Sequence, residues 1–384
     1  MMTRRERLMA TLRGDRVDRP PVNFYELGGF ETDPSDPSEF NVYSDPSWRP
    51  LLQLAEERSD LIRMRSAVRA RSWDPQATPD FQDAVRMQEY RDGQCLCTRL
   101  TVRAGGHVLS STTRRDPAVD TVWTTEHLLK NTSDVEAYLQ LPDDVFAEQI
   151  DVRRLVAEDE DLGDRGIVMV DTEDPICAAA SLFDMATFLT IALTEPTLLH
   201  RLLEKLARPL YARTERVSAS FPGHLWRVYG PEYAAEPFLP PRLFREYVTC
   251  YTGPLVKMIK EHGGFARIHC HGRIGAILDQ ICEMDADATD PVEPPPQGDV
   301  QLGDVRRAYG DQLVLFGNIE ISDIESMEPA AFRRVVERAL AEGTQGRGRG
   351  FVLMPSSAPN GRAITSRTIQ NYETMVELAE SWRL

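Results

Sequence analysis

Two histidines separated by a single residue carry the clearest chemical signal in the sequence. His269 and His271 lie in the stretch FARIHCHG, residues 265–272, which is typical of a β-strand that ends in a glycine turn. Side chains alternate between the two faces of a strand, so both imidazoles share one face while Cys270 points to the other. Such a pair could bind a metal ion, exchange protons with a substrate, or be two polar residues packed at a strand end.

Eight short apolar segments could form the strands that position these histidines. Most are followed by a helical segment, and repeated β-α units with right-handed crossovers close into a barrel. The predicted fold class is therefore α/β, a (β/α)8 TIM barrel. The alternative, an open doubly wound sheet, would favour a longer glycine-rich loop than Gly28-Gly29 after its first strand. The predicted strands are residues 21–25, 61–66, 167–171, 225–229, 265–270, 288–292, 313–317 and 351–354.

Residues 86–125 interrupt this alternation of strands and helices. They contain β-rich runs separated by Asp-Gly at 92–93 and Gly-Gly at 105–106, and such pairs mark hairpins. We expect one domain, residues 1–384, with an inserted β-hairpin excursion at residues 86–125. Cys95 and Cys97 should lie on one of its strands with both sulfur atoms on one face, where packing is favoured over metal binding.

Polar residues gather where the predicted strands end, which is where barrel enzymes place their chemistry. An H-x-H pair with one carboxylate would make a three-ligand zinc or iron site with an open position, and Glu293 is a candidate for that carboxylate. Arg63 and Arg65 share a face of their strand and could bind an anionic substrate group or be solvated, and Glu26 could be a solvated loop carboxylate. The candidate catalytic residues are His269, His271, Glu232 and Asn318, and the candidate substrate-binding residues are Glu26, Arg63, Arg65, Tyr233 and Ser357.

The composition restricts the kinds of partner. The 384 residues include 44 Lys and Arg against 60 Asp and Glu, and the resulting net charge of −16 repels nucleic acids and anionic membranes. No apolar run approaches the roughly 20 residues that span a bilayer. The first residues, MMTRRERLMATLRGDR, contain no apolar signal core. We therefore expect a cytoplasmic protein with reduced cysteines that acts on a small molecule.

Several segments together resemble the uroporphyrinogen decarboxylase superfamily, which includes the corrinoid-dependent methyltransferases. The likeness covers nearly the whole chain apart from the β-excursion. It implies a single (β/α)8 barrel, in agreement with the predicted strands, and a homodimer. The segments that carry it are RRER at 4–7 with DRPPV at 18–22, PRLFREY at 241–247, IHCHG at 268–272, LFGN at 315–318 and GFVLMPSS at 350–357.

The chain departs from both branches of that superfamily at the residues that matter for activity. The methyltransferases hold zinc with an H-x-C pair and a later cysteine, but His271 and Ser357 stand where the two cysteines are expected. The decarboxylases carry an arginine-rich segment after their first strand, but residues 24–29 read FYELGG. The histidine of the decarboxylase motif NLGHG falls near Ser357. The resemblance thus implies an altered site whose activity differs from uroporphyrinogen decarboxylation.

Three functional hypotheses remain. The leading one is metal-assisted methyl transfer or demethylation of a small molecule. In it His269 and His271 hold zinc together with Glu232 or Glu293, and a corrinoid on a partner protein or a folate carries the methyl group. The second is a metal-independent lyase or decarboxylase that uses the two histidines as acid and base. The third is a barrel that binds a small ligand without catalysis.

Overall fold

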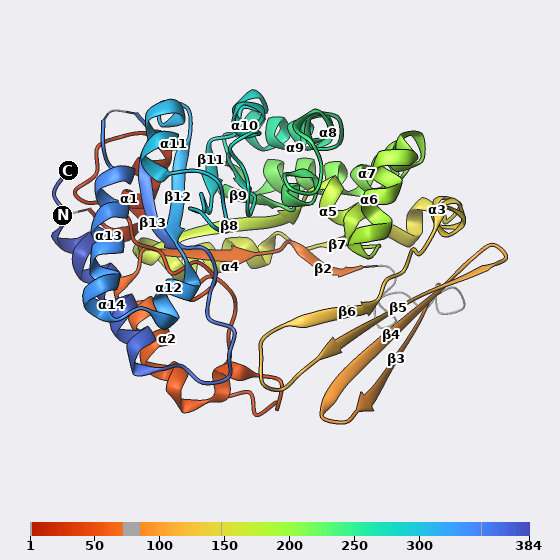
Figure 1. The fold of residues 1–384 in the computed structure, drawn as a ribbon, viewed down its shortest axis with the longest axis horizontal. Coiled ribbons are helices and arrows are strands. Elements are labelled where there is room, and N and C mark those ends of the chain that lie inside the picture. The colour runs from red at the N-terminus through yellow and green to blue at the C-terminus, as the bar shows by residue number, and fades with distance from the viewer. Residues whose placement is uncertain (1, 72–84, 147, 347) are drawn as a thin grey trace.

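Seven parallel strands form the curled sheet at the centre of the computed structural model, which describes residues 2–71, 85–146, 148–346 and 348–384 (Figure 1). The sheet confirms the predicted α/β barrel fold. Its strands are buried on both faces because side chains fill the inside and helices cover the outside. In sheet order they are β1 Leu61–Arg65, β8 Gly166–Glu173, β9 Leu225–Tyr229, β10 Phe265–His269, β11 Ala288–Asp290, β12 Val314–Ile319 and β13 Phe351–Pro355.

The eighth predicted strand, residues 21–25, is reduced to a single bridge in the described chain. Val22 pairs in parallel with Leu353 of β13. On its other side, the Val22 carbonyl accepts a hydrogen bond from Asp60 N at 2.6 Å, just before β1. Two prolines precede Val22 and cannot donate to a ladder, and Tyr25 turns the chain away with a φ of 58°. The segment therefore closes the ring without forming a full strand.

Helices cover the outside of the barrel, and the first of them closes its amino-terminal end. Leu8 and Leu12 of α1 are buried against the inward-facing residues of the sheet. A π-helical turn, Arg245–Thr249, joins α8 to α9. The helices are α1 Arg4–Arg13, α2 Arg49–Arg58, α3 Thr132–Leu139, α4 Arg153–Leu162, α5 Pro175–Ala180, α6 Met185–Thr194, α7 Pro196–Ser220, α8 Pro241–Phe244, α9 Cys250–Glu261, α10 Leu278–Glu283, α11 Leu302–Tyr309, α12 Ile321–Ser326, α13 Pro329–Gly343 and α14 Ser366–Ser381.

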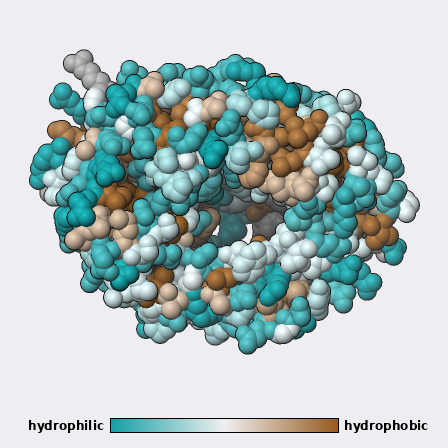
Figure 2. Space-filling view, in the orientation of Figure 1, coloured by the Kyte–Doolittle hydropathy of each residue, from teal (hydrophilic) through white to brown (hydrophobic). Residues whose placement is uncertain are grey.

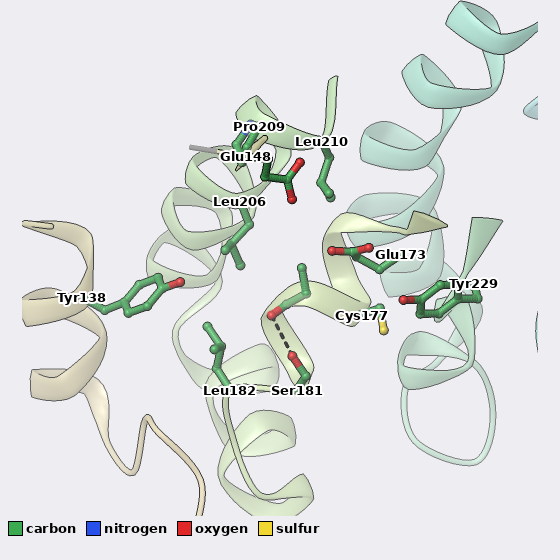
Figure 3. Close-up of a pocket in the computed structure, with 11 residues that line it drawn as sticks. Tyr138, Glu148, Glu173, Cys177, Ser181, Leu182, Leu206, Pro209, Leu210 and Tyr229 are labelled. Atoms are coloured by element: carbon green, nitrogen blue, oxygen red, sulfur yellow. Dashed lines mark hydrogen bonds between the residues drawn. The ribbon is translucent and has the colours of Figure 1, made fainter. Parts of the chain in front are cut away.

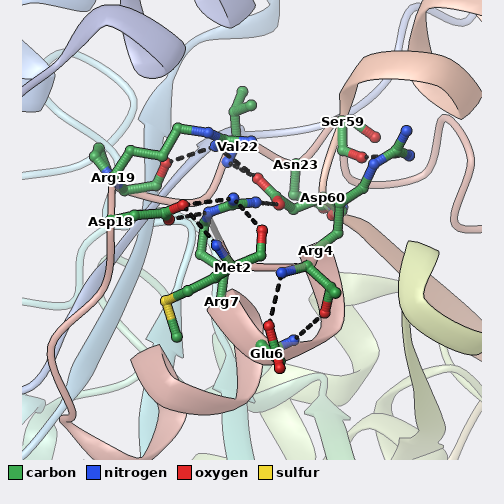
Figure 4. A network of polar contacts seen from close by, with 12 residues as sticks. Met2, Arg4, Glu6, Arg7, Asp18, Arg19, Val22, Asn23, Ser59 and Asp60 are labelled. Carbon is green, nitrogen blue, oxygen red and sulfur yellow. Dashed lines mark hydrogen bonds and ion pairs between the residues drawn. The ribbon is translucent and has the colours of Figure 1, made fainter.

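A buried ionic cluster joins α1, the Val22 segment and the start of β1 (Figure 4). The carboxylate of Asp60 accepts hydrogen bonds from Arg7 Nη1 at 2.5 Å, Arg19 Nη1 at 2.9 Å and Val22 N at 2.9 Å. Arg7 also pairs with Asp18 at 2.8 Å. Because Asp60 is fully buried and both of its oxygens have partners, this cluster fixes the amino-terminal end of the barrel.

The excursion between β1 and β8 is a four-stranded antiparallel sheet that lies beyond the carboxyl ends of the barrel strands (Figure 1). Cys95 and Cys97 both lie on its strand β4, buried and with free thiols. Figure 2 shows a hollow near the centre of this face, between the parallel strands and the antiparallel sheet. The sheet contains β3 Val85–Asp92, β4 Cys95–Ala104, β5 His107–Arg115 and β6 Val122–Glu126, and a separate pair is formed by β2 Val68–Arg71 and β7 Glu148–Ile150.

Candidate active site

His269 is the last residue of β10 and is held by the neighbouring strand. It pairs with Asp290 of β11, and its Nδ1 lies 2.7 Å from Asp290 Oδ2. Since the carboxylate only accepts, Nδ1 carries the proton and the Nε2 lone pair is left for another partner, with the Tyr25 hydroxyl 3.4 Å away. Burial lowers the pKa of His269 to about 4, so the ring is neutral at neutral pH.

Asp290 keeps its charge although it is fully buried. Burial alone would raise its pKa, but the charge of Arg267 and the contact with His269 outweigh that effect and lower the pKa of Asp290 to about 2. Arg267 Nε lies 3.0 Å from Asp290 Oδ1, without the alignment of a hydrogen bond. The site thus contains a neutral imidazole beside a permanent carboxylate, which can stabilise a proton gained by the ring.

His271 stands in the glycine turn after β10 and has a carboxylate of its own. Its Nδ1 lies 2.8 Å from Glu293 Oε1, and Gly272 N donates to Glu293 Oε2 at 2.6 Å. Burial would lower the pKa of His271, but the hydrogen bond and charge of Glu293 outweigh it and raise the pKa. The two imidazole centroids are 4.6 Å apart with planes at 87°, and the His271 side chain is 38% exposed. His271 is therefore the solvent-facing, more basic member of the pair.

Beneath this pair lies a layer of buried charges that the sequence analysis did not identify. Asp171, Arg227 and Arg267 are paired across β8, β9 and β10. Arg227 Nη1 lies 3.1 Å from Asp171 Oδ1, and the guanidinium stacks 4.9 Å from the ring centroid of Tyr229. The sequence could have revealed these arginines through strand periodicity. Arg227 lies two positions before Tyr229 and Arg267 two positions before His269, so each shares the face of that inward-facing residue.

Four carboxyl groups whose pKa is raised by burial follow the ends of barrel strands or the Val22 segment. Burial raises the pKa values of Glu26 and Glu232, and it raises those of Glu320 to about 7 and Asp174 to about 8. Glu26 accepts a hydrogen bond from Ala358 N at 3.1 Å. Glu232 Oε2 and Glu320 Oε1 are buried without a hydrogen-bond partner. Of these four groups, Asp174 is fully buried and accepts hydrogen bonds from Cys177 N and the Thr252 hydroxyl, so it supports the rim from below.

The structure does not bring the two predicted arginines of β1 to the histidines. They lie on the face opposite Ile62 and Met64, whose side chains belong to the barrel interior. Arg63 donates to Gly28 O at 2.6 Å, and Arg65 donates to Gly29 O at 2.7 Å. Both also pair with Glu158 of α4. The two arginines thus hold two other elements against the sheet, the loop that follows Val22 and the helix α4.

Two predicted substrate contacts, Tyr233 and Ser357, and the predicted catalytic residue Asn318 lie at the rim without a hydrogen bond to the imidazoles in the described chain. Tyr233 lies in the turn Pro231–Ala234 after β9, and Asn318 is partly exposed on β12. Ser357 Oγ donates to Ala358 O at 3.2 Å. In the part of the chain that the structure describes, no hydrogen bond joins any of these three residues to His269 or His271.

The donor atoms around the two histidines do not meet the needs of a metal ion. Glu293, the predicted third ligand, uses one oxygen for His271 and the other for Gly272 N. Among residues 2–71, 85–146, 148–346 and 348–384, no three His, Cys, Asp or Glu side chains are grouped so that they could hold a metal ion. As the side chains stand, the residues do not complete a zinc site, although the imidazole and carboxylate groups suit zinc chemically.

Comparisons with known proteins place this site within a family. Residues 120–382, which include both histidines, match the model of the family "Uroporphyrinogen decarboxylase (URO-D)". A uroporphyrinogen decarboxylase of Pseudomonas putida (strain GB-1) is 29% identical over 168 residues. That match covers 42% of this chain and 44% of the relative, so the chain spans less than half the length of this curated protein.

A solved structure supports the whole fold. A methyltransferase from Methanosarcina mazei has a TM-score of 0.62 over 98% of this chain and 99% of its own, at 15% identity. At that identity the likeness shows the fold alone. None of the described helices is both long enough and apolar enough to cross a membrane.

Proposed function

The chain belongs to the uroporphyrinogen decarboxylase (URO-D) family, and we propose that it transforms a small molecule by acid–base catalysis at His269 and His271. One observation carries this proposal: each imidazole is held at Nδ1 by its own carboxylate, at 2.7 and 2.8 Å. Burial lowers the pKa of one ring, and Glu293 helps to raise the pKa of the other. Titratable groups whose environments separate their pKa values in this way act as acid and base.

The surroundings of the two imidazole rings give them different roles in proton transfer. Neutral His269 accepts a proton at Nε2, and Asp290 stabilises the imidazolium that results. His271, charged in a larger fraction of molecules, donates a proton to the substrate atom that gains electron density. In a lyase reaction His269 takes the substrate proton that is released and His271 protonates the leaving group; in a decarboxylation carbon dioxide leaves from the carboxylate and His271 protonates the carbon that keeps the electron pair. Solvent reaches the site through the exposed side of His271, so its proton can be restored from water.

The experiment is an untargeted substrate search with a chelation arm. Purified protein is incubated with a small-molecule extract, with and without EDTA, and mass spectrometry records which compounds lose carbon dioxide or a methyl group. We expect a loss of carbon dioxide that EDTA leaves unchanged and that His271→Ala abolishes. Turnover that survives in a His269→Ala/His271→Ala double variant would reject the acid–base proposal, and binding without turnover in the wild type would indicate a ligand-binding barrel.

Metal-assisted methyl transfer is the second candidate, and two observations favour it. A carboxylate on Nδ1 is the arrangement that orients metal-binding histidines, and both imidazoles have it. Glu232 Oε2 is buried without a partner. Because the structure does not group Glu232 with the two imidazoles, this candidate requires that metal binding bring them together; His269, His271 and Glu232 would then hold zinc, which would supply Lewis-acid assistance toward a substrate heteroatom. A folate, or a corrinoid on a partner protein, would carry the methyl group.

Metal analysis separates the two candidates. Less than about 0.1 zinc per chain in protein purified without chelator rejects the metal-assisted mechanism, because a functional site should retain its ion. Loss of a methyl group from a substrate, abolished by EDTA and restored by zinc, would favour it over acid–base catalysis. We further propose a cytoplasmic location and a homodimer without nucleic-acid or membrane partners, consistent with the net charge of −16.

A further inference from the structure

A cavity of about 410 Å³, called the first chamber below, lies between the ends of β8 and β9 and the helices α5 and α7 (Figure 3). Glu173, Cys177 and Tyr229 lie at one end of it and Tyr138 at the other. Its volume is in the range of small-molecule sites. Most of its wall is apolar, with contributions from Ala178, Leu182, Leu206, Pro209 and Leu210.

A second chamber of about 150 Å³ adjoins the first beneath the antiparallel sheet. The side chains of Tyr138, Ser181 and Leu182 line both chambers, so the two spaces have these walls in common. Tyr138 marks the end of the first chamber that lies away from Tyr229. The second chamber therefore extends the first lengthwise, and the two together make an elongated space.

The antiparallel sheet presents a single face to the second chamber. Its lining side chains stand at directly paired positions of neighbouring strands, which places them on the same side of the sheet. The pairs are Val85 with Val102, Leu100 with Ser111, and Thr113 with Thr124. The inserted sheet thus forms one wall of the chamber, and Leu128, Leu141 and Val145 add apolar surface to the rest.

The charges around this space favour an uncharged ligand. Among the described residues, no lysine or arginine lines either chamber, and the second chamber is lined by no charged side chain. The two carboxylates of the first chamber, Glu148 and Glu173, already accept hydrogen bonds from the buried Arg213, at 2.7 and 3.0 Å. A charged ligand would lose its hydration in the apolar space without gaining a new partner of opposite charge.

Hydroxyl groups give the second chamber its polar character. Ser111 and Thr113 lie two apart on β5 and therefore share the lining face, and Thr124 of β6 stands beside Thr113. A hydroxyl group both donates and accepts hydrogen bonds. A neutral polar group at the end of an apolar ligand, such as a hydroxyl or a carbonyl, can therefore be bound there.

We propose that the two chambers together bind an uncharged, elongated apolar molecule with a hydroxyl or carbonyl group at one end. The inserted sheet then has a role in ligand binding, because it supplies the hydroxyl-bearing wall of the second chamber. The inference goes beyond the proposed acid–base function, since neither His269 nor His271 is among the described residues that line the chambers. The site adjoins the catalytic end of the barrel, because Tyr229 pairs with His269 across β9 and β10.

The test measures binding without turnover, by displacement of the uncharged fluorescent probe N-phenyl-1-naphthylamine from the full chain. Straight-chain primary alcohols from 1-hexanol to 1-decanol should displace it with an affinity that rises about fourfold per methylene, because each methylene is buried against apolar walls. Decanoate and decylammonium should bind at least about tenfold more weakly than 1-decanol. Failure of 1-decanol to bind, an affinity that does not depend on chain length, or equal or tighter binding of either ion overturns the inference.

Two variants locate the ligand within the chambers. Ala178→Trp fills the first chamber and Ser111→Trp fills the second, and each should weaken 1-decanol at least about tenfold. Ala186→Trp, on the exposed side of α6, is the matched control and should leave the affinity unchanged. Ala178→Leu and Ser111→Leu are smaller changes that apply the same test if a tryptophan variant folds poorly. Unchanged affinity in either filled chamber overturns the inference, because the ligand then does not extend through both.

Discussion

Two buried ionic clusters lie at opposite ends of the barrel strands, and they differ in how fully their polar atoms are paired. At the amino-terminal end, both oxygens of Asp60 accept hydrogen bonds from side chains or backbone that surround them (Figure 4). At the carboxyl end, polar atoms are buried without hydrogen bonds, among them Arg227 Nε, Arg267 Nη2 and Glu232 Oε2. The complete cluster supports the fold, whereas the incomplete one leaves buried polar atoms without hydrogen bonds.

The largest change in stability is expected from a substitution in the complete cluster around Asp60. Asp60→Ala should lower the free energy of unfolding by about 3–5 kcal/mol, because it leaves Arg7 and Arg19 without their shared carboxylate in the protein interior. Denaturant unfolding measures the change. Glu136→Ala, which breaks an exposed pair with Arg201, is the matched control and should leave the free energy of unfolding nearly unchanged. Equal losses in the two variants would contradict the comparison.

A substitution at the carboxyl end of the barrel should lower the catalytic rate without lowering the stability of the protein. His271→Ala is expected to lower kcat about 10²- to 10⁴-fold, the usual contribution of a positioned acid or base. Its melting temperature should stay close to that of the wild type because the side chain is 38% exposed. His262→Ala removes a partly exposed histidine that pairs with Glu215 and should change neither quantity. A large loss of stability in His271→Ala would mean that this end of the barrel is structural as well.

The pH dependence of stability should reveal the neutral His269. Its folded pKa of about 4 lies below the ordinary value of 6.5, so the unfolded chain takes up the proton first as pH falls. The contribution of His269 is complete above pH 6.5 and is lost as pH falls toward 4, by about 2–3 kcal/mol. Unfolding of the wild type and of His269→Gln across this window measures it. Parallel pH curves for the two proteins would refute the assignment.

The smallest effect concerns Asp174, which caps α5 by accepting from Cys177 N at 2.7 Å. Burial raises its pKa to about 8, so the carboxyl is mostly protonated at neutral pH. At pH 4, where little of the ionisation cost has accrued, Asp174→Asn should change stability by less than about 1 kcal/mol, since an amide replaces a neutral acid and still caps the helix. As pH rises from about 4 to 8, the unfolded chain ionises at this position while the folded chain keeps its proton, so the wild type loses stability that the variant keeps; above pH 8 the difference stops growing. Thermal melts at pH 4, 7 and 9 compare the two.

The barrel could be predicted because its signal is local. Apolar strands followed by helices recur along the chain, and the H-x-H spacing alone places both imidazoles on one side of β10. Residues 21–25 were predicted to form a full strand but form a single bridge. Their apolar pattern is that of a strand, but the two prolines before Val22 cannot donate hydrogen bonds and the chain turns at Tyr25. That turn depends on backbone geometry and not on side-chain pattern.

The partners of the histidines depend on strand register, which a single sequence does not encode. His269 meets Asp290 because β10 and β11 pair at those residues, and Arg227 meets Asp171 for the same reason on β9 and β8. Arg63 shares its alternating pattern with Arg227 but faces out of the barrel. Alternation reveals that two residues share a face, but only the closed ring shows which face is inside.

The single bridge at Val22 makes the junction between this segment and β13, called the seam below, the place where few backbone hydrogen bonds close the barrel. Asn23 N to Leu353 O and Leu353 N to Pro21 O, each 2.9 Å, join it to β13, whereas β9 pairs along its length with a strand on each side. Amide hydrogen exchange at Asn23 and Leu353 should therefore proceed through local opening, at a lower free energy than exchange in β9. Tyr25, which faces His269, lies just past that seam. The side of the barrel at Val22 should therefore open locally more easily than the side formed by β9.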